Sequence, residues 1–263
     1  MTKVAVNGAG GRMGQKVISL VAENDDCDLT CALEDSGHAK IGIDAGEFVG
    51  AGHLGIPLGY ELSKDVDVLI DFSAPQATLD RARECVQNGI AMVIGTTGFS
   101  ADERSELEET AAQKVPVLIA PNMGLGVNLL FGLVGEVARA LGEDYDVEII
   151  ETHHRRKKDA PSGTAGKLAE NICEAQGWDP DDAVVYGREG LTGERPSNQL
   201  GIHAVRGGGV VGEHTVIFAA EGERIELTHR AQGRDLFAQG AVRAALFLAD
   251  QPAGLYDMED VLF

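Results

Sequence analysis

The sequence predicts an α/β protein with two domains, the first of which contains a parallel β-sheet. Short apolar segments of strand length alternate with helix-length segments up to about residue 124. A glycine-rich loop follows the first apolar segment. Beyond residue 124 the alternation gives way to a different pattern that includes a predicted hairpin.

The first domain is predicted to cover residues 1–124. Its expected strands are residues 3–7, 28–34, 66–72, 91–94 and 115–120. Residues 35–60 are rich in glycine and show no periodicity, so we expect mostly loop there. Strands that alternate with helices in this way form a parallel sheet.

The helices of the first domain are indicated by periodicity and by their start signals. One helix is expected from about Gly11 to Asn24. A second begins at Pro75, because proline is well accepted at the first helical position. A third follows Ser100, which forms a capping box with Glu103. Together these helices are expected to cover both faces of the sheet.

The second domain is predicted to cover residues 125–233. Helices are expected at residues 127–141 and 162–176, a strand at 147–152, and a hairpin of strands at 213–220 and 224–230. The stretch between the second helix and about residue 210 is expected to be irregular. A last helix is expected at residues 236–250.

Composition indicates an acidic, folded protein. Of its 263 residues 44% are hydrophobic, and 22 Lys and Arg against 42 Asp and Glu give a net charge of −20. Such a surface argues against general binding to nucleic acid or anionic membranes. The four cysteines have neither CxxC nor zinc-site spacing, so we expect free thiols. We see no apolar run of membrane-spanning length and no signal-peptide pattern, and we expect a cytoplasmic protein.

The loop Gly8-Ala9-Gly10-Gly11-Arg12-Met13-Gly14 lies between a predicted strand and a predicted helix. Here glycines let the backbone approach a pyrophosphate, and the helix N-terminus faces the anion. Met13 stands where a strict GxGxxG motif has glycine. Glu34 ends the second strand and can accept hydrogen bonds from the adenosine ribose hydroxyls. Both features favour a Rossmann dinucleotide-binding domain over the alternative, a tight turn with a solvated carboxylate.

Two further loops follow the fourth and fifth predicted strands. They are Gly95-Thr96-Thr97-Gly98 and Ala120-Pro121-Asn122-Met123. Ligands of open parallel sheets bind at the carboxyl ends of strands, so both loops are candidates to line a nicotinamide pocket. Ordinary connecting loops are an equally good explanation of either segment taken alone.

Basic residues cluster between His153 and Lys158, where four Lys or Arg and two His are consecutive. A site for an anionic small molecule explains such a cluster in an acidic protein, although a solvated basic turn is the alternative. The following Pro161-Ser162-Gly163-Thr164 predicts a helix start that offers backbone N–H groups and two hydroxyls to an anion, which suits a dicarboxylate substrate. We expect no metal, because adjacent histidines on a strand point to opposite faces and we see no third ligand.

Together these motifs resemble the 4-hydroxy-tetrahydrodipicolinate reductase family, long called dihydrodipicolinate reductase. The resemblance lies in residues 8–14, 95–98, 122, 126–128, 151–165, 211–215 and 228–231, and the segment 153–165 is its most specific part. It implies an N-terminal Rossmann domain and a C-terminal α/β domain that binds substrate and forms a homotetramer through an open mixed sheet. The final segment, residues 234–263, would return to the first domain.

The resemblance also implies an activity and its residues. The chain would transfer hydride from NADH or NADPH to the cyclic imine dicarboxylate 4-hydroxy-tetrahydrodipicolinate, in the diaminopimelate route to lysine. His153 and Lys157 would be the catalytic proton-transfer residues, and which of them gives the proton is left open. The substrate-binding residues would be His154, Ser162, Gly163 and Thr164. The cofactor-binding residues would be Gly8, Ala9, Gly10, Gly11, Arg12, Met13, Glu34, Gly95, Thr96, Thr97, Ala120, Pro121, Asn122 and Met123.

Two positions depart from the family pattern. Gly124 stands where many relatives have Ser, at the expected interdomain hinge. Asp35 stands where relatives that use NADPH well often carry Arg, and its charge beside Glu34 would repel a 2′-phosphate. We therefore expect a preference for NADH.

Two other functions remain open at this point. One is another two-domain nicotinamide-dependent amino-acid dehydrogenase, in which the segment 153–165 is not expected. The other is a non-catalytic dinucleotide sensor, which would have no need of His153 and Lys157.

Overall fold

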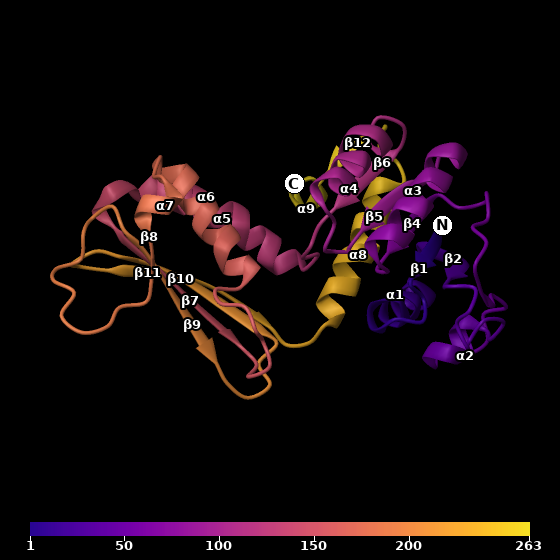
Figure 1. Ribbon diagram of the computed structural model, residues 1–263, viewed down its shortest axis with the longest axis horizontal. Coiled ribbons are helices and arrows are strands. Elements are labelled where there is room, and N and C mark those ends of the chain that lie inside the picture. Colours follow the sequence, from indigo (N-terminus) through magenta and orange to yellow (C-terminus); the bar gives the residue numbers. More distant parts are fainter. The chain divides into compact units, whose positions relative to one another are not determined.

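The computed structural model describes residues 1–109 and 111–263, and the chain divides into two compact units. Unit 1 consists of Met1–Leu125 together with Asp235–Phe263, and unit 2 is Gly126–Arg234 (Figure 1). The C-terminal segment is therefore part of the unit that contains the glycine loop. The predicted α/β fold class is confirmed, because a parallel and a mixed sheet each combine with helices.

Unit 1 is built on a parallel sheet, which has seven strands within the described residues. In sheet order they are β12 (Gly254–Tyr256), β6 (Pro116–Ile119), β5 (Ala91–Ile94), β4 (Val68–Asp71), β1 (Thr2–Asn7), β2 (Cys27–Leu33) and β3 (Leu58–Gly59). The order runs outward from β1 in both directions, so the switch point of the sheet lies between β1 and β4. Ligands of such sheets bind beyond the strand ends at this point.

Helices cover both faces of this sheet (Figure 1). One face packs against α1 (Arg12–Glu23), α8 (Asp235–Leu248) and α9 (Met258–Leu262), and the other against α3 (Pro75–Asn88) and the π-helix η1 (Glu106–Ala111). Successive residues of β1 alternate between the two cores, with Val4 and Val6 in one and Ala5 in the other. Burial on both faces explains why these strands are near-continuous apolar runs.

The start signals predicted for the helices of unit 1 are present. Pro75 occupies the first turn of α3. Ser100 and Glu103 form the predicted capping box at α4 (Ala101–Ser105), which precedes η1.

The predicted loop 35–60 contains two short elements that periodicity did not reveal. They are α2 (Ala45–Val49) and β3. One side chain organises the region: the Asp44 carboxylate accepts hydrogen bonds from the backbone N–H groups of Glu47 and of residues 54–56. Such a local hub stabilises a short helix without an amphipathic pattern. Strand β12 and helix α9 were also missed, because each is too short for periodicity.

Unit 2 contains a mixed sheet, with five strands in the part of the chain described. In sheet order they are β11 (Arg224–Ala231), β10 (Gly212–Ala219), β7 (Asp146–His153), β9 (Leu200–Arg206) and β8 (Val184–Tyr186). Strands β7, β9 and β8 are parallel, whereas β10 runs antiparallel to both β7 and β11. The predicted hairpin is the β10–β11 pair. The helical elements that accompany the sheet are α5 (Leu125–Leu141), η2 (Gly142–Asp144), α6 (Gly163–Gln176) and α7 (Pro180–Ala183).

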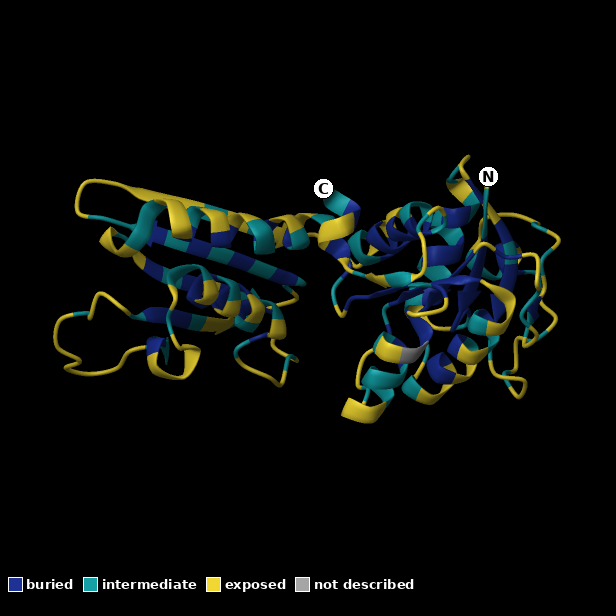
Figure 2. Ribbon diagram, turned by 90° about the horizontal axis from the view of Figure 1, so that it is seen from above, coloured by how far each residue is buried: buried dark blue, intermediate teal, exposed yellow. Residues whose placement is uncertain are grey.

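Helices α5 and α6 cover one face of the mixed sheet, and the other face is open (Figures 1 and 2). Along β7, Val147, Ile149, Glu151 and His153 are buried, while the intervening Ile150 is 38% exposed. This alternation is typical of a sheet with a single covered face. The predicted open mixed sheet is confirmed.

Two predictions for unit 2 were wrong. The stretch expected to be irregular contains β8 and β9, and β9 lies inside the sheet between β7 and β8. The helical stretch Leu125–Asp144 contains an 18-residue window with a mean hydropathy of 1.4, so it is long and apolar enough to span a membrane by length and composition alone. The expectation that no apolar run reaches that length therefore fails. Buried side chains of this helix, such as Leu130 and Val134, belong to the core of unit 2, as in an amphipathic core helix.

Candidate active site

The glycine loop of unit 1 joins β1 to α1 with almost no space for side chains. Gly8 has φ +77°, and a Cβ there would lie 2.4 Å from the carbonyl oxygen of Phe72. A Cβ at Gly14 would lie 2.1 Å from the Gly8 carbonyl oxygen. The N-cap of α1 is Gly11, which has no side chain that could cap the helix. The loop therefore offers backbone N–H groups at a helix N-terminus, as an anion site requires.

Glu34 lies against this loop. Its Oε2 accepts a hydrogen bond from the Gly10 N–H at 2.7 Å, and its Oε1 accepts one from the Asp35 N–H at 3.0 Å. A Cβ at Gly10 would lie 2.8 Å from both Glu34 Oε2 and His38 Cε1. The Asp35 carboxylate is exposed and accepts from the Gly37 N–H at 2.9 Å. The structure thus brings two predicted cofactor residues, Gly10 and Glu34, into direct contact.

A buried carboxylate that the sequence reasoning missed connects the strand ends. Asp71, at the end of β4, accepts hydrogen bonds from Asn7 Nδ2 at 2.6 Å, Thr96 Oγ1 at 2.6 Å and Thr78 Oγ1 at 2.9 Å. It also accepts from the backbone N–H and hydroxyl of Ser73. The signal for it was an acidic residue closing an apolar strand. This network fixes Thr96, a predicted cofactor residue.

The remaining predicted cofactor loops lie at the carboxyl ends of β5 and β6. A Cβ at Gly95 would overlap the Phe72 ring, at 2.1 Å. Asn122 Oδ1 accepts from the Gly124 N–H at 3.0 Å, so the residue that departs from the family pattern is part of this turn. A Cβ at Gly240 of α8 would lie 1.6 Å from the Met123 carbonyl oxygen. All the predicted cofactor residues therefore follow the carboxyl ends of parallel strands of one sheet.

In unit 2, His153 ends β7 and contacts a fully buried carboxylate. Its Nδ1 lies 2.6 Å from Glu151 Oε2. Arg206, at the end of β9, donates from both Nη atoms to the two Glu151 oxygens, each at 2.7 Å, and the Ser162 N–H donates to Oε1 at 3.0 Å. Burial by itself raises the pKa of Glu151, but the hydrogen bonds from Arg206, His153 and Ser162 hold it below its usual range.

A second histidine, His214 of β10, completes this cluster. Its Nε2 lies 3.0 Å from Ser162 Oγ, and its ring meets the His153 ring edge-on, with 5.2 Å between centroids. Burial, followed by repulsion from His153, lowers the pKa of His214 to about 4. His214 is therefore neutral at neutral pH. Sequence reasoning missed its contact with the site, although it lies in a motif that carried the resemblance.

The predicted substrate residues gather at the start of α6. Ser162 is buried, and its hydroxyl accepts from the Ala165 N–H at 3.2 Å, so it is the N-cap of α6. Gly163 is exposed, and no described atom lies within 4 Å of the position that a Cβ would occupy there. The Nδ1 atom of His154 is buried without a hydrogen-bond partner among the described residues.

Lys157 lies in the turn that follows β7. Its backbone N–H donates to the His154 carbonyl, and its ammonium group forms a 2.8 Å ion pair with Asp159. The Asp159 carbonyl accepts a hydrogen bond from Arg206 Nη2 at 2.8 Å, so this turn contacts the Glu151 cluster. The neighbouring Arg155, Arg156 and Lys158 are exposed.

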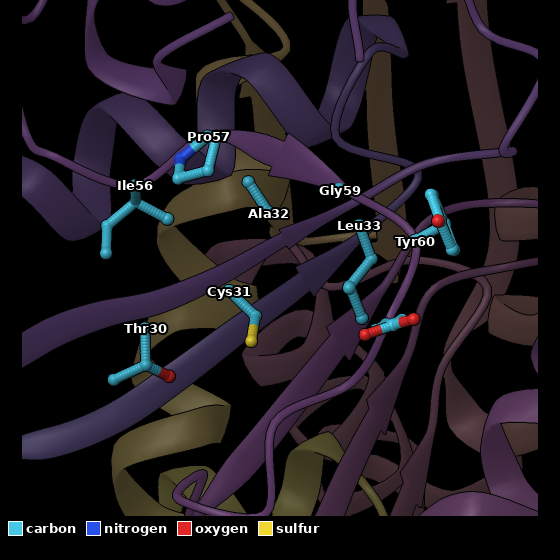
Figure 3. Close-up of a pocket in the computed structure, with 9 residues that line it drawn as sticks. Thr30, Cys31, Ala32, Leu33, Ile56, Pro57, Gly59 and Tyr60 are labelled. Carbon is cyan, nitrogen blue, oxygen red and sulfur yellow. The ribbon is translucent and has the colours of Figure 1, made fainter. Parts of the chain in front are cut away.

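Outside the glycine-loop region and the His153 cluster, the remaining candidates for a functional site are metal ligands, cysteines and pockets. Residues 1–109 and 111–263 contain no group of three or more His, Cys, Asp or Glu that could hold a metal. The four cysteines are buried free thiols. A pocket of about 360 Å³ lies at the sheet edge of unit 1, where Figure 3 shows Cys31, Leu33 and Tyr60 among its lining residues. Its lining is distinct from the predicted cofactor residues.

Comparison with known proteins covers almost the whole chain. The family described as dihydrodipicolinate reductase, N-terminus, matches residues 2–123, and its C-terminus counterpart matches residues 126–262. The 4-hydroxy-tetrahydrodipicolinate reductase of Anaeromyxobacter dehalogenans (strain 2CP-1 / ATCC BAA-258) is 51% identical, with 100% of this chain and 98% of that protein covered. The protein of the same name from Hahella chejuensis (strain KCTC 2396) is also 51% identical, with 100% and 99% covered.

A solved structure agrees with the sequence comparison. The dipicolinate-bound dihydrodipicolinate reductase from Paenisporosarcina sp. TG-14 is 27% identical and has a TM-score of 0.76, with 100% of both chains covered.

Proposed function

The chain belongs to the dihydrodipicolinate reductase family, and from this premise we propose that it reduces 4-hydroxy-tetrahydrodipicolinate to tetrahydrodipicolinate with a nicotinamide cofactor. This is the reductase step of the diaminopimelate route of lysine biosynthesis. The observation that carries the proposal is the match of 51% identity over the full chain, shared with two reductases of this name. The buried His153 cluster beside the start of α6 fits the same chemistry.

The cofactor fits the glycine loop of unit 1. Glycines at positions 8 and 14 allow a tight turn in which a Cβ would meet the protein's own backbone, and the start of α1 can present its first-turn N–H groups to a pyrophosphate. Glu34 lies where it can accept hydrogen bonds from ribose hydroxyls. When bound, NADH or NADPH supplies the hydride. Residues 8–13, 95–97 and 120–123 are proposed to contact it.

NADH is proposed to be the preferred cofactor. The 2′-phosphate of NADPH carries nearly two negative charges, and the site beside Glu34 adds the exposed carboxylate of Asp35. An Arg at position 35 would instead offer a charge-assisted hydrogen bond. Repulsion between exposed charges is screened by salt, so we expect a preference of about tenfold in kcat/KM.

The substrate carboxylates are proposed to bind at the N-terminus of α6. Gly163 and Thr164 begin this helix, and the N-terminus of a helix favours a negative charge. His154 adds a buried ring nitrogen that has no partner among the residues described. The Ser162 hydroxyl is occupied by the Ala165 N–H and His214, so its proposed contribution is to hold the helix start in place.

Reduction of the imine requires a proton as well as a hydride, and His153 and Lys157 are proposed to manage it. A positioned proton donor typically contributes about 10²–10⁴-fold to the rate. His153 is held by Glu151, and Lys157 is paired with Asp159 and can donate from its ammonium group.

Assembly and location complete the proposal. The open face of the unit 2 sheet exposes Ile150 and Val205, and we propose that it forms the contact of a homotetramer. The proposed partners are the cyclic imine dicarboxylate and further copies of the chain, in the cytoplasm.

The decisive experiment mixes the purified protein with freshly generated substrate and follows the loss of NADH. His153→Ala and Lys157→Ala are each expected to lower kcat by at least about 10²-fold, with cofactor affinity little changed. Lys158→Ala is the matched control, because it removes an exposed cation next to Lys157 and should leave kcat unchanged within about twofold.

The same assay separates the alternatives. An amino-acid dehydrogenase would turn over amino acids instead of the imine, and a sensor would bind NADH without turnover. Near-normal kcat in both His153→Ala and Lys157→Ala would contradict the assigned roles.

A further inference from the structure

Two glutamates of β7 have nearly the same set of partners. Glu148 accepts hydrogen bonds from both Nη atoms of Arg188 and from Arg195 Nε, and it lies 2.7 Å from His203 Nε2. Glu151 accepts from both Nη atoms of Arg206 and lies 2.6 Å from His153 Nδ1. They differ in their surroundings. Glu148 lies on the open face with 20% of its side chain exposed, whereas Glu151 lies on the covered face and is fully buried. Only the Glu151 cluster includes a proposed catalytic residue.

Burial makes the Glu151 cluster costly to assemble. A carboxylate taken out of water is tolerated only where donors replace its hydration. Glu151 receives four N–H donors, two from Arg206, one from His153 and one from the Ser162 backbone. An ionised carboxylate only accepts hydrogen bonds, so the contact with His153 requires a proton on Nδ1. The other ring nitrogen, Nε2, is then the basic atom of neutral His153.

The surroundings of Nε2 suit proton transfer. A Cβ added at Gly212 would lie 3.1 Å from His153 Nε2, so glycine at this position leaves that nitrogen uncovered. The groups that face the cluster are Arg206 from β9, neutral His214 from β10 and Ser162 from α6. The turn that carries the Lys157–Asp159 pair contacts it through the Asp159 carbonyl, which accepts from Arg206.

We propose that Glu151 is a positioning residue for the reaction: it fixes His153 in the tautomer with the proton on Nδ1, and it ties the start of α6 to the same carboxylate. Arg206 keeps Glu151 ionised, because its planar guanidinium binds both oxygens at once. One side chain thus sets the orientation of a proposed proton-transfer group and of the proposed carboxylate anchor. This inference rests on the proposed function for its kinetic consequence, but the tautomer is a property of the protein alone.

The first test needs no variant. Nitrogen-15 NMR of the histidine rings at a pH where His153 is neutral should show its proton on Nδ1. A proton on Nε2 in the wild-type protein overturns the proposal. Because this measurement uses no substrate, its outcome is independent of whether the chain reduces the proposed imine.

The second test is kinetic. Glu151→Gln replaces the acceptor by an amide that can donate to Nδ1, so kcat should fall by about tenfold to 10²-fold while the KM for NADH changes little. The acidic limb of the kcat–pH profile should move to lower pH by about one unit, because the imidazolium loses a negative neighbour. Glu151→Asp, which keeps the charge, should restore part of kcat.

Glu148→Gln is the matched control. It removes the same kind of carboxylate, with the same types of partner, from the same strand, and kcat should stay within about twofold of wild type. A kcat loss in Glu151→Gln no larger than that in Glu148→Gln, or an unmoved pH profile, overturns the proposal. If Glu151→Gln fails to fold, the wild-type NMR measurement still decides it.

Discussion

Acid should destabilise unit 2 through His214. In the folded protein this side chain is 4% exposed, and burial, followed by the neighbouring His153, lowers its pKa from 6.5 to about 4. In the unfolded chain the ring titrates at its ordinary value. Between these two values the unfolded state binds the proton and the folded state does not, so the free energy of unfolding falls as the pH falls through this window. Below about pH 4 both states are protonated and this loss ends.

The size of the effect follows from the two pKa values. The interval from 6.5 to about 4 corresponds to about 3 kcal/mol of unfolding free energy. About 2 kcal/mol of it is lost between about pH 7 and about pH 4.5. That is a large fraction of the stability of an ordinary domain.

The measurement uses the only tryptophan, Trp178, which packs against the core of unit 2 and therefore reports its unfolding. Urea unfolding of wild type and of His214→Gln is followed by fluorescence at both pH values. The variant loses packing at every pH, so the quantity to compare is the change in unfolding free energy with pH, not its absolute value. Wild type should lose about 2 kcal/mol more than the variant on acidification. Equal losses would show that folded His214 takes up its proton at the ordinary pH, and would refute the reasoning.

Three further predictions concern cofactor choice, stability and assembly. Wild type should prefer NADH by about tenfold in kcat/KM, and Asp35→Arg should narrow or reverse this gap through the KM for NADPH; equal wild-type values at low salt would contradict it. Asp71→Asn should lower the free energy of unfolding by about 3 kcal/mol in urea titrations followed by circular dichroism, because it breaks a buried hydrogen-bond network, and a loss below about 1 kcal/mol would count against that role. Light scattering at micromolar concentration should show a tetramer that Ile150→Asp disrupts, whereas a monomeric wild type would exclude this assembly.

Elements of the fold were predictable where a segment carries its own pattern. Strands such as Ala91–Ile94 are apolar throughout because both faces are buried, and their limits were found within about two residues. Strand Leu200–Arg206 was missed because it carries Gly201 and His203 among its apolar residues. A side-chain contact with β7 supports it instead, as His203 Nε2 lies 2.7 Å from Glu148 Oε2, and periodicity does not reveal such a contact.

In the candidate site too, residues within one continuous motif were predictable, and residues brought in by strand pairing were not. The glycine loop and the segment around His153 are continuous in sequence, so their residues were found together. Arg206 and His214 lie on other strands, and the register of the sheet brings them to the site. Arg206 is paired with His153 between β9 and β7, and His214 is paired with Glu151 between β10 and β7. The spacing of these residues along the chain does not predict which strands will pair or in what register.

Unit 1 is made of two separate segments of the chain, and this determines the order in which the two units can fold during synthesis. Unit 2 is one continuous segment, whereas unit 1 needs Asp235–Phe263 to supply α8, β12 and α9. Every residue of unit 2 therefore leaves the ribosome before unit 1 can close, although unit 1 begins the chain. Until α8 is synthesised, α1 is the main helix on this sheet face, the part that α8 covers is bare, and the backbone contact of Gly240 with Met123 cannot form. A stop codon after residue 234 would leave unit 2 whole in sequence and unit 1 without α8 and α9 on that face. The exposed apolar surface would make this truncated chain prone to aggregation and to binding by chaperones.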